Sequence, residues 1–556
     1  MSTFSIRGLE FHSSRMWQWH QVRLAIDLMK KNGMNTLIFH QNDIPEQLVY
    51  PAAYFNDEFM WKRCAVRMHT IWNNRHYISR LIRALDKNNI KFFIEVKELW
   101  FPDVLPEEYP HLWKNGSACP FNPFWWKYIE DKYNELFSIV PGISGVIVSP
   151  GTRESKISFA ANKCKCPDCK DKTAVEWYTK LIEAMYKPIS KYNKTLVIRD
   201  FSYSAGNQRN IIEAAGNVSK DIVIALKNTP HDYYPTFPNN PSIGNCSDHP
   251  QWVEFDSWGQ FFGLGVFPCS VVEDMQARMR HCAKKGVEGV WVRTDWEGVT
   301  EGSSFNSLNL LNVFGAGMLS QDVNTNIDDI YRAWTDHGLL SPMKSGSEPQ
   351  TPAKPSSPEA WKTLKDFMIS SWKIIEKSQY VRGHVFNEDD QYCNSVDRFI
   401  DIMVKTHGRD DWDPGASLLV KPTDENISII LDEKRQAVKE AEELAGKIDF
   451  KKLGFPEDFC NEMKTILMLY PVYVKGFEYC AQGVFYAEKY RLEKNDQDKK
   501  QVNDAIDKLQ KFTTEVNDFL KGSDYPHYIY WLLDMERLGE FIDDLKARVK
   551  QGRTKN

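Results

Sequence analysis

Residues 145–200 read GVIVSPGTRESKISFAANKCKCPDCKDKTAVEWYTKLIEAMYKPISKYNKTLVIRD. Two short apolar runs, at residues 145–149 and 195–200, flank a segment at 175–191 whose apolar side chains recur with the period of a helix. Runs rich in Val, Ile and Leu that lack polar alternation are typical of parallel strands buried on both faces. The stretch therefore predicts a strand, a helix and a second strand parallel to the first.

The same alternation extends over the first part of the chain. Eight runs rich in Val, Ile, Phe or Leu occur at residues 6–11, 35–40, 91–96, 145–149, 195–200, 221–226, 251–255 and 289–293. Amphipathic helical patterns separate most of them, at residues 17–31, 77–87, 122–137, 175–191 and 271–285. No glycine-rich phosphate loop follows any run, which argues against a doubly wound nucleotide-binding sheet. Eight such units predict a closed (β/α)8 TIM barrel that ends near a helix at 306–318.

A Pro- and Ser-rich segment at residues 341–358 separates this region from a different pattern. Such a composition is typical of a linker or a long loop. Every later apolar pattern is helical, at residues 360–378, 425–448, 456–492, 496–520 and 528–549. We therefore expect a (β/α)8 catalytic barrel at 1–340, a linker at 341–358 and an all-α helical domain at 359–556.

Composition limits the partners to be expected. The 556 residues carry a formal net charge of −5 with acids and bases interspersed, unlike a basic nucleic-acid-binding protein. We see no apolar stretch of the about 18 residues that a membrane span needs, and no secretory signal at the N-terminus. The 11 scattered cysteines suit a reducing compartment. We expect a cytoplasmic protein without nucleic-acid or membrane partners; a trimmed secreted protein and a homodimer stay open.

Polar side chains follow the ends of the apolar runs. In a TIM barrel these positions form one concave face, because the loops after the strands lie side by side. Glycoside hydrolysis needs two carboxyl groups that flank the scissile bond, and indole or amide groups that hold the sugar. The predicted ring of carboxylates therefore suggests a sugar-cleaving site, although any single carboxylate can instead be an ion-pair partner of a nearby base. Its members include His12, His40, Glu154, Arg199, Tyr203, Lys227, Asn228, Glu254, Asp256, Asp295, Trp296 and Glu297.

Several of these segments resemble one known family in their order. GVIVSPGTRESK, VIRDFSY, DIVIALKNTPHDYYP, WVEFDSWGQ and GVWVRTDWEG are similar to the strand-end motifs of the α-glucuronidases of glycoside hydrolase family 67. The resemblance covers roughly residues 140–335, and Lys227, Asn228, Pro230 and Asp232 form its most specific match. The chain also resembles relatives of that barrel such as the family 163 endo-β-N-acetylglucosaminidases, which carry a C-x-C-x-x-C segment after the fourth strand.

The resemblance implies roles for individual residues. Glu154 matches the general acid of family 67, Arg199 matches an arginine that contacts the substrate, and Asp295 matches a carboxylate that positions the attacking water in an inverting reaction. The chain departs from the family at Pro150, where the family has a lysine that helps to bind the uronate. A second carboxylate has no clear match after Asp295. The candidates for it are Glu297, Glu301, Asp256 and Glu254.

These residues favour a glycoside hydrolase that cleaves a uronide or hexosaminide linkage and uses no cofactor in catalysis. We predict catalytic roles for Glu154, Asp295 and Glu297, and substrate contacts for the other members of the ring. One alternative is a substrate-assisted retaining hexosaminidase, which needs a second carboxylate near Glu154, from Asp200 or Asp256. Further alternatives are a non-catalytic carbohydrate-binding barrel and a helical interaction protein.

Three cysteines lie close together in the segment CKCPDC, at Cys164, Cys166 and Cys169. Cys-x-x-Cys spacing allows two thiolates to bind one tetrahedral metal ion. The cluster predicts a structural zinc ion whose fourth ligand comes from elsewhere, either another Cys, Asp168 or a His. Three reduced cysteines in a tight loop, without metal, are the alternative.

Overall fold

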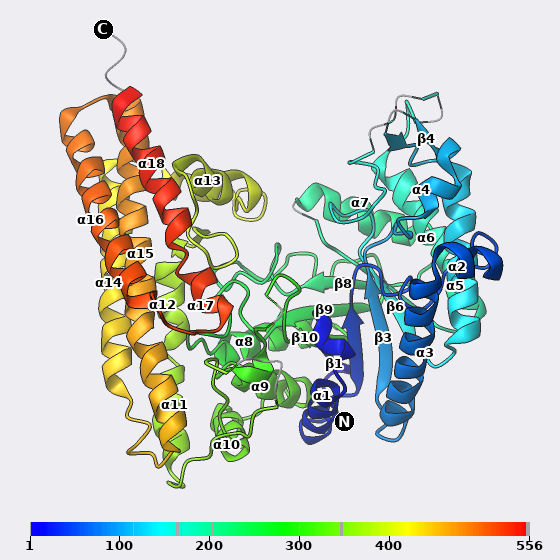
Figure 1. Cartoon of the computed structure of the whole chain (residues 1–556), viewed down its shortest axis with the longest axis horizontal. Helices are drawn as coiled ribbons and strands as arrows, with labels where there is room; N and C mark the ends of the chain where they lie inside the picture. The colour runs from blue at the N-terminus through cyan, green and yellow to red at the C-terminus, as the bar shows by residue number, and fades with distance from the viewer. Residues whose placement is uncertain are drawn as a thin grey trace.

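The computed structural model describes residues 2–114, 116–162, 164, 166–167, 169–202, 204–299, 301–344 and 349–551. Within these residues eight parallel strands close into a barrel, in the spatial order β1-β10-β9-β8-β7-β6-β3-β2 (Figure 1). The strands are β1 Ile6–Phe11, β2 Thr36–His40, β3 Lys91–Val96, β6 Gly145–Val148, β7 Thr195–Arg199, β8 Val223–Lys227, β9 Gln251–Asp256 and β10 Gly289–Arg293. Each predicted run overlaps one of them, so the TIM-barrel fold is confirmed.

Every second residue of each strand points into the barrel, as the two-residue period of a strand requires. A lower apolar layer fills the interior with Ile6, Ile38, Phe93, Ile147, Val197, Val223, Ala225, Trp252 and Trp291. The next inward positions toward the C-terminal ends of the strands are polar. We call them the polar layer: Glu10, His40, Glu95, Ser149, Arg199, Lys227, Glu254 and Arg293, all of them buried. The core of the barrel therefore leads directly into a buried ionic network.

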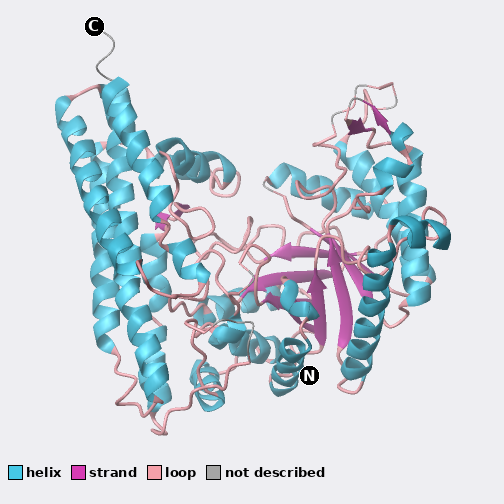
Figure 2. Cartoon of the chain, in the orientation of Figure 1, coloured by secondary structure: helices cyan, strands magenta, loops and turns pink. Residues whose placement is uncertain are grey.

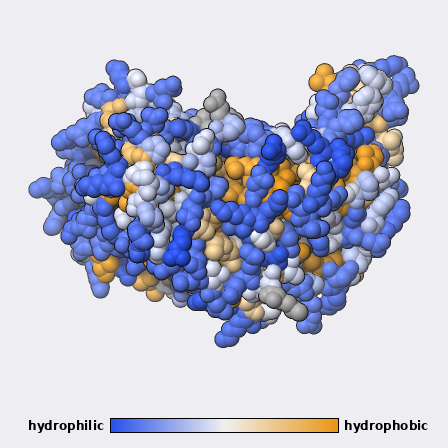
Figure 3. All heavy atoms as spheres, turned by 90° about the horizontal axis from the view of Figure 1, so that it is seen from below, coloured by the Kyte–Doolittle hydropathy of each residue, from blue (hydrophilic) through white to orange (hydrophobic). Residues whose placement is uncertain are grey.

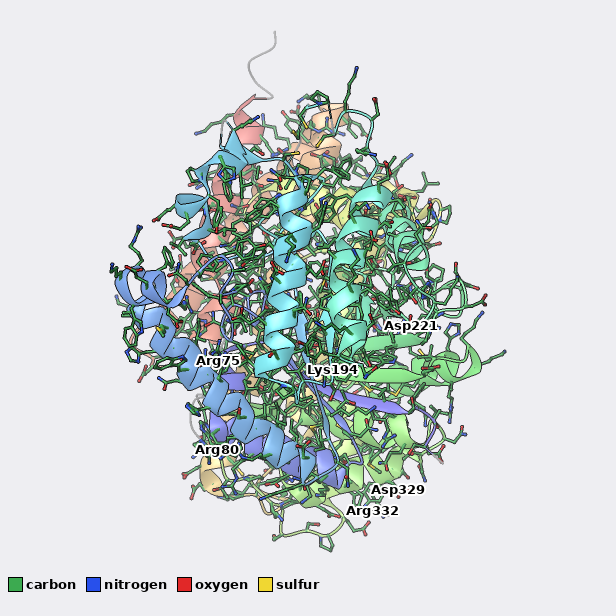
Figure 4. The ribbon with its side chains drawn as sticks, turned by 90° about the vertical axis from the view of Figure 1, so that its right-hand side faces the viewer. Arg75, Arg80, Lys194, Asp221, Asp329 and Arg332 are labelled. Atoms are coloured by element: carbon green, nitrogen blue, oxygen red, sulfur yellow. The ribbon has the colours of Figure 1, made fainter. Side chains whose placement is uncertain are left out.

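Helices surround the barrel. They include α1 Trp19–Lys31, α3 Ala65–Asp86, α5 Pro123–Ile139, α6 Ala174–Lys191, α7 Ala205–Gly216, α8 Val272–Lys284, α9 Leu310–Gln321 and α10 Ile327–His337. Figure 4 looks onto this outer layer, where α5 and α6 pack side by side and Arg80 of α3 is labelled. The Arg80 guanidinium lies 4.0 Å from the centre of the Trp19 ring, which joins α3 to α1. The sequence did not predict α7 or α10.

The C-terminal region is helical, as predicted, apart from the two-stranded pair β11 Tyr380–Val381 and β12 His384–Val385. The long helices α14, α15 and α16 pack together with α18 as a bundle, at the left of Figure 1. Two predicted helices, at 360–378 and 528–549, are each divided into two. The elements are α11 Ala360–Met368, α12 Ser371–Ser378, α13 Val396–Asp401, α14 Asp424–Lys447, α15 Glu457–Glu493, α16 Asp496–Leu520, α17 His527–Leu532 and α18 Met535–Gln551.

The helical domain packs directly on the barrel. Phe267, which follows β9, stacks on Tyr470 and Tyr473 of α15 with ring centres 4.9 and 4.8 Å apart. One buried hydrophobic cluster contains residues of both parts. Ala353, within the predicted linker, exchanges two backbone hydrogen bonds of 2.8 Å with Leu339, so this segment returns to the end of the barrel domain. The boundaries at 340 and 358 stay predictions.

The strands of the barrel point with their C-terminal ends toward the helical bundle and α7, as Figures 1 and 2 show. The face seen from below in Figure 3 is mainly hydrophilic, with hydrophobic residues gathered near its middle. Among the described residues, no helix combines the length and the apolar character that crossing a bilayer requires.

Candidate active site

Arg199, at the end of β7, is the centre of the polar layer. Its Nε lies 2.7 Å from Glu254 Oε2 and 3.1 Å from Glu95 Oε1, and its Nη2 donates to Glu254 Oε1 at 3.0 Å. Burial raises the pKa of Glu95 to about 7. In Glu254 the effect of burial is outweighed by Arg199, and the pKa is lowered. Two buried carboxylates beside one guanidinium therefore differ in their affinity for a proton.

Glu10 and His40 extend the same network toward β1 and β2. His40 Nδ1 lies 2.9 Å from Glu10 Oε1, and Trp291 Nε1 donates to Glu10 Oε2 at 2.6 Å. Burial raises the pKa of Glu10 and lowers the pKa of His40. The His40 ring also stacks on His12, with ring centres 3.6 Å apart and an interplanar angle of 11°. This network forms the floor of the site.

Glu154 and Glu297 meet at Lys97 above this floor. Glu154 lies in the loop after β6, contacts Lys97 Nζ and accepts a hydrogen bond of 3.1 Å from Asn42 Nδ2. Glu297 follows β10, and its Oε1 lies 3.7 Å from the same ammonium nitrogen. The two glutamate side chains are 37% and 45% exposed, whereas Lys97 is 1% exposed. We call this group, Lys97, Glu154 and Glu297, the barrel mouth.

His12 is the second partner of Glu297. Its Nε2 lies 2.6 Å from Glu297 Oε2, and because a carboxylate only accepts, this nitrogen carries the proton. Burial would raise the pKa of Glu297, but His12 and then Lys97 outweigh it and hold that pKa below its usual range. The pKa of His12 is itself lowered, mainly by burial. Glu297 is thus an ionised carboxylate at neutral pH.

Asp295 is fully buried beneath the barrel mouth. Its Oδ1 accepts a hydrogen bond of 2.7 Å from the His12 backbone N–H, and its Oδ2 accepts one from Ser13 Oγ. These bonds hold the loop after β1, and with it the His12 ring. The contacts favour a positioning role for Asp295 over the water-positioning role that the family resemblance implies.

Two further carboxylates are engaged by neighbouring groups, and Asp256 Oδ1 also lies 3.3 Å from Arg293 Nε. Asp256 Oδ2 accepts hydrogen bonds of 2.9 and 3.2 Å from the backbone N–H groups of Gly259 and Gln260. Asp200 accepts from the Ser202 N–H at 3.0 Å and from the side chain of Gln208 at 2.6 Å. Substrate-assisted catalysis would need one of these carboxylates beside Glu154, so their contacts argue against that alternative.

Lys227, at the end of β8, is buried and contacts Asp232. Its Nζ lies 4.2 Å from the centre of the Phe201 ring, and Lys97 Nζ lies 5.2 Å from the same centre. Asn228, next along the chain, is buried and donates its backbone N–H to Glu254 O at 2.9 Å. Both predicted substrate contacts therefore lie at the edge of the polar layer.

Trp296 brings the helical domain close to the barrel mouth. Its ring is half-buried and lies edge-on to Trp531 of α17, with centres 6.3 Å apart. Tyr203, the remaining predicted substrate contact, lies outside the described residues. A cavity of about 630 Å³ opens beside Glu297, within the usual range of small-molecule sites. Its lining includes His12, Trp17, His40, Asn42 and Trp100.

The structure thus brings Glu154, Glu297 and His12 together, and it places Arg199, His40 and Glu254 in the floor. The sequence places Lys97 and Glu95 at the end of the third run, on the same rim, but assigns no individual role to Lys97, Glu95 and Glu10. A signal for the last two was present, because each is an acidic residue inside an otherwise apolar strand, in KFFIEV and IRGLEF. Lys97 lies two residues after Glu95, so both side chains point to the same, inward-facing side.

No family model matches the chain, and no curated protein matches it. Among solved structures, a GH138 enzyme targeting pectin rhamnogalacturonan II has a TM-score of 0.63 at 13% identity, over 93% of this chain and 62% of that one. A GH20 exo β-N-acetylglucosaminidase from Vibrio harveyi, in an inactive mutant form, has a TM-score of 0.40 at 12% identity, over 58% and 54%. The structure of CpGH84B gives 0.40 at 10% identity, over 99% and 77%.

This chain spans 62% of the length of the GH138 enzyme. At 13% identity that similarity shows a shared fold alone. Membership of family 67 is not shown by these comparisons. The barrel with its helical domain is a fold that this chain shares with a glycoside hydrolase.

Proposed function

We propose that this chain is a glycoside hydrolase in which Glu154 protonates the leaving oxygen and Glu297 acts as the ionised carboxylate. One observation carries the proposal: both glutamates, from the loops after β6 and β10, contact the Lys97 ammonium at the barrel mouth. Two carboxyl groups that meet at one position of the barrel mouth are the groups that glycoside hydrolysis requires.

The surroundings of the two glutamates support different roles. His12 and Lys97 hold the pKa of Glu297 low, which suits a base or a nucleophile. Glu154 has the Lys97 ammonium and the Asn42 amide as partners. A sugar that displaces Lys97 from Glu154 would remove a cation and water together, and both changes favour a protonated carboxyl group. Glu154 is therefore the better general acid.

Lys97 supports a uronide as the substrate. Family 67 has a lysine four residues before its acid, a position that Pro150 occupies here, whereas β3 supplies Lys97 to the same glutamate. The buried Lys97 side chain holds its ammonium between Glu154 and Glu297. On substrate binding this ammonium would pair with the carboxylate of a uronic acid next to the scissile bond. A hexosaminide is the second candidate and rests on the family resemblance alone.

A panel of 4-nitrophenyl glycosides tests the proposal. It compares both anomers of glucuronides, galacturonides and N-acetylhexosaminides, with the wild type, Glu154→Gln, Glu297→Gln and the control Glu213→Gln. Glu213 is an exposed residue of α7, so the control makes the same chemical change away from the site.

We expect the wild type and Glu213→Gln to hydrolyse a uronide. In Glu297→Gln kcat should fall by about 10²–10⁴-fold, and in Glu154→Gln it should fall by a smaller factor, because 4-nitrophenolate leaves with little help from an acid. Calorimetry should still detect binding of the sugar to both variants. Full activity in Glu154→Gln would overturn the assignment of the acid. Hydrolysis of hexosaminides alone would overturn the substrate class while leaving the hydrolase intact.

A further inference from the structure

We infer that Cys119, Cys164, Cys166 and Cys169 bind one Zn²⁺ ion that joins the loops after β3 and β6. Their four Sγ atoms all lie within 4.8 Å of one another. Cys119 Sγ is 3.3 Å from Cys169 Sγ and 3.8 Å from Cys166 Sγ. In a tetrahedral site with Zn–S bonds of about 2.3 Å, neighbouring sulfurs lie about 3.8 Å apart. The thiols therefore surround a space of the size that zinc occupies.

Cys119 is the ligand that the sequence does not reveal. It lies 45 residues before Cys164, between β5 Ser117–Ala118 and α5, and it has no Cys-x-x-Cys partner of its own. Folding brings it to the CKCPDC segment, which completes the four ligands of a closed structural site. Because all four positions are taken by protein thiolates, the ion would have no open position for a substrate.

A disulfide or a hard metal ion fits the cluster less well than zinc does. A disulfide has sulfurs about 2.05 Å apart, and the 3.3 Å between Cys119 and Cys169 leaves both thiols free. Four thiolates without a carboxylate or an imidazole form a soft ligand set, which favours zinc over magnesium or calcium. Each cysteine would bind as a thiolate, so four protons leave the site as the ion enters.

Hydrogen bonds from two tryptophans hold the backbone at Cys119 in place. Trp125 Nε1 donates to the Cys119 carbonyl at 2.9 Å, and Trp177 Nε1 donates to the carbonyl of Pro120 at 3.0 Å. Both tryptophans are fully buried, one on α5 and the other on α6. The Cys119 ligand is therefore preorganised by the helices that precede and follow β6, the strand before Glu154.

The CKCPDC segment has a matching turn. The Cys166 carbonyl accepts hydrogen bonds of 3.1 Å from the N–H groups of both Cys169 and Lys170. This turn brings the two thiols of the Cys-x-x-Cys pair to one side. Cys164 is also oriented toward it, because its Sγ accepts from the Cys166 N–H at 3.5 Å.

The joined loops are those that carry Lys97 and Glu154. Near the barrel they are already connected, because Glu98 O accepts from Gly151 N at 2.8 Å and from Ser155 Oγ at 2.9 Å. The cysteine cluster connects them a second time, further from the barrel. Zinc would therefore act as a positioning element for Glu154 and Lys97. Its binding does not depend on the proposed hydrolase activity and is measured without a substrate.

Metal analysis of the full chain tests the inference. The protein is purified without a metal-binding tag and its zinc and iron are measured by mass spectrometry, for the wild type, Cys119→Ser and the control Cys460→Ser. Cys460 is a half-buried cysteine of α15 outside the cluster. We expect about one zinc per chain in the wild type and the control, and a loss of at least tenfold in Cys119→Ser.

A second measurement on the wild type covers the case in which Cys119→Ser does not fold. A mercurial thiol reagent should release zinc in proportion to the protein, and Co²⁺ in place of zinc should give the absorption bands of a tetrahedral thiolate site. Absence of metal, iron in place of zinc, or an intact mass reduced by disulfide formation would overturn the inference. Unchanged zinc in a folded Cys119→Ser would overturn the role of Cys119.

Discussion

His12 connects the two carboxylates that follow β10. Its backbone N–H is bound by Asp295 at 2.7 Å, and its ring lies 2.6 Å from Glu297. Burial by itself would raise the pKa of Glu297. His12 is the largest of the influences that outweigh burial and lower this pKa. The structure therefore makes His12 a residue that sets the proton affinity of the proposed carboxylate.

Replacing His12 by Ala should raise the pKa of Glu297 toward the ordinary glutamate value of about 4.3. Because Glu297 must be ionised, the acidic limb of the kcat/KM profile should move to higher pH in the variant, while the alkaline limb stays in place. The pH dependence of uronide hydrolysis measures both limbs. An acidic limb at the wild-type pH would show that His12 does not act on Glu297.

The residues of the site differ in how far the sequence predicts them. His12 follows an apolar run directly, and Glu154 and Glu297 lie in the loops just after two others, so the barrel rule places all three on one face. Lys97 follows the run at 91–96 and is placed on that face by the same rule, but its contacts with Glu154 and Glu297 depend on how the barrel closes and could not be predicted. For Asp295 the sequence predicted the position after the last strand, but it did not predict the hydrogen bonds to the loop after β1.

At the scale of elements, β1 passes β10 so closely that glycine is required at one position. A Cβ atom at Gly8 would lie 2.6 Å from the Cβ of Trp291, inside the barrel. Gly539, within α18, has no heavy atom within 4 Å of such a Cβ, and glycine weakens a helix interior. These two positions make a matched pair of Gly→Ala substitutions.

We predict that Gly8→Ala lowers the free energy of unfolding by about 1–3 kcal/mol, as overpacking of a core does. Gly539→Ala should raise it by about 0.5–1 kcal/mol, because alanine favours the helix. Chemical denaturation followed by circular dichroism measures both. Equal stability of Gly8→Ala and the wild type would mean that the strands are not packed as described.

The strands were predictable because each is a short apolar run buried on both faces. The points at which predicted helices divide into two were not predictable, because they depend on local hydrogen bonds of side chains. The predicted helix at 360–378 is interrupted between α11 and α12, where Ser371 Oγ donates to the Met368 carbonyl at 2.5 Å. Serine bonds of this kind compete with the helical backbone pattern. An apolar periodicity continues through such a break and so does not show it.

For the whole molecule, the packing indicates that the barrel and the helical domain unfold together. Phe267 stacks between them, and Tyr380 Oη donates to Phe261 O at 2.7 Å across the same boundary. Scanning calorimetry of the full chain should therefore show one transition in which both parts melt. Two resolved transitions would show that the helical domain is an independent unit attached by the segment at 341–358.

The assignment of Glu154 as general acid is tested most directly by leaving groups. The rates kcat/KM of the wild type and Glu154→Ala are compared on a phenyl and a 2,4-dinitrophenyl glycoside of the same uronic acid. A phenolate needs a proton to leave and a dinitrophenolate does not. We predict a loss of about 10²–10⁴-fold on the phenyl glycoside and a far smaller loss on the dinitrophenyl glycoside. Equal losses on both would contradict the account.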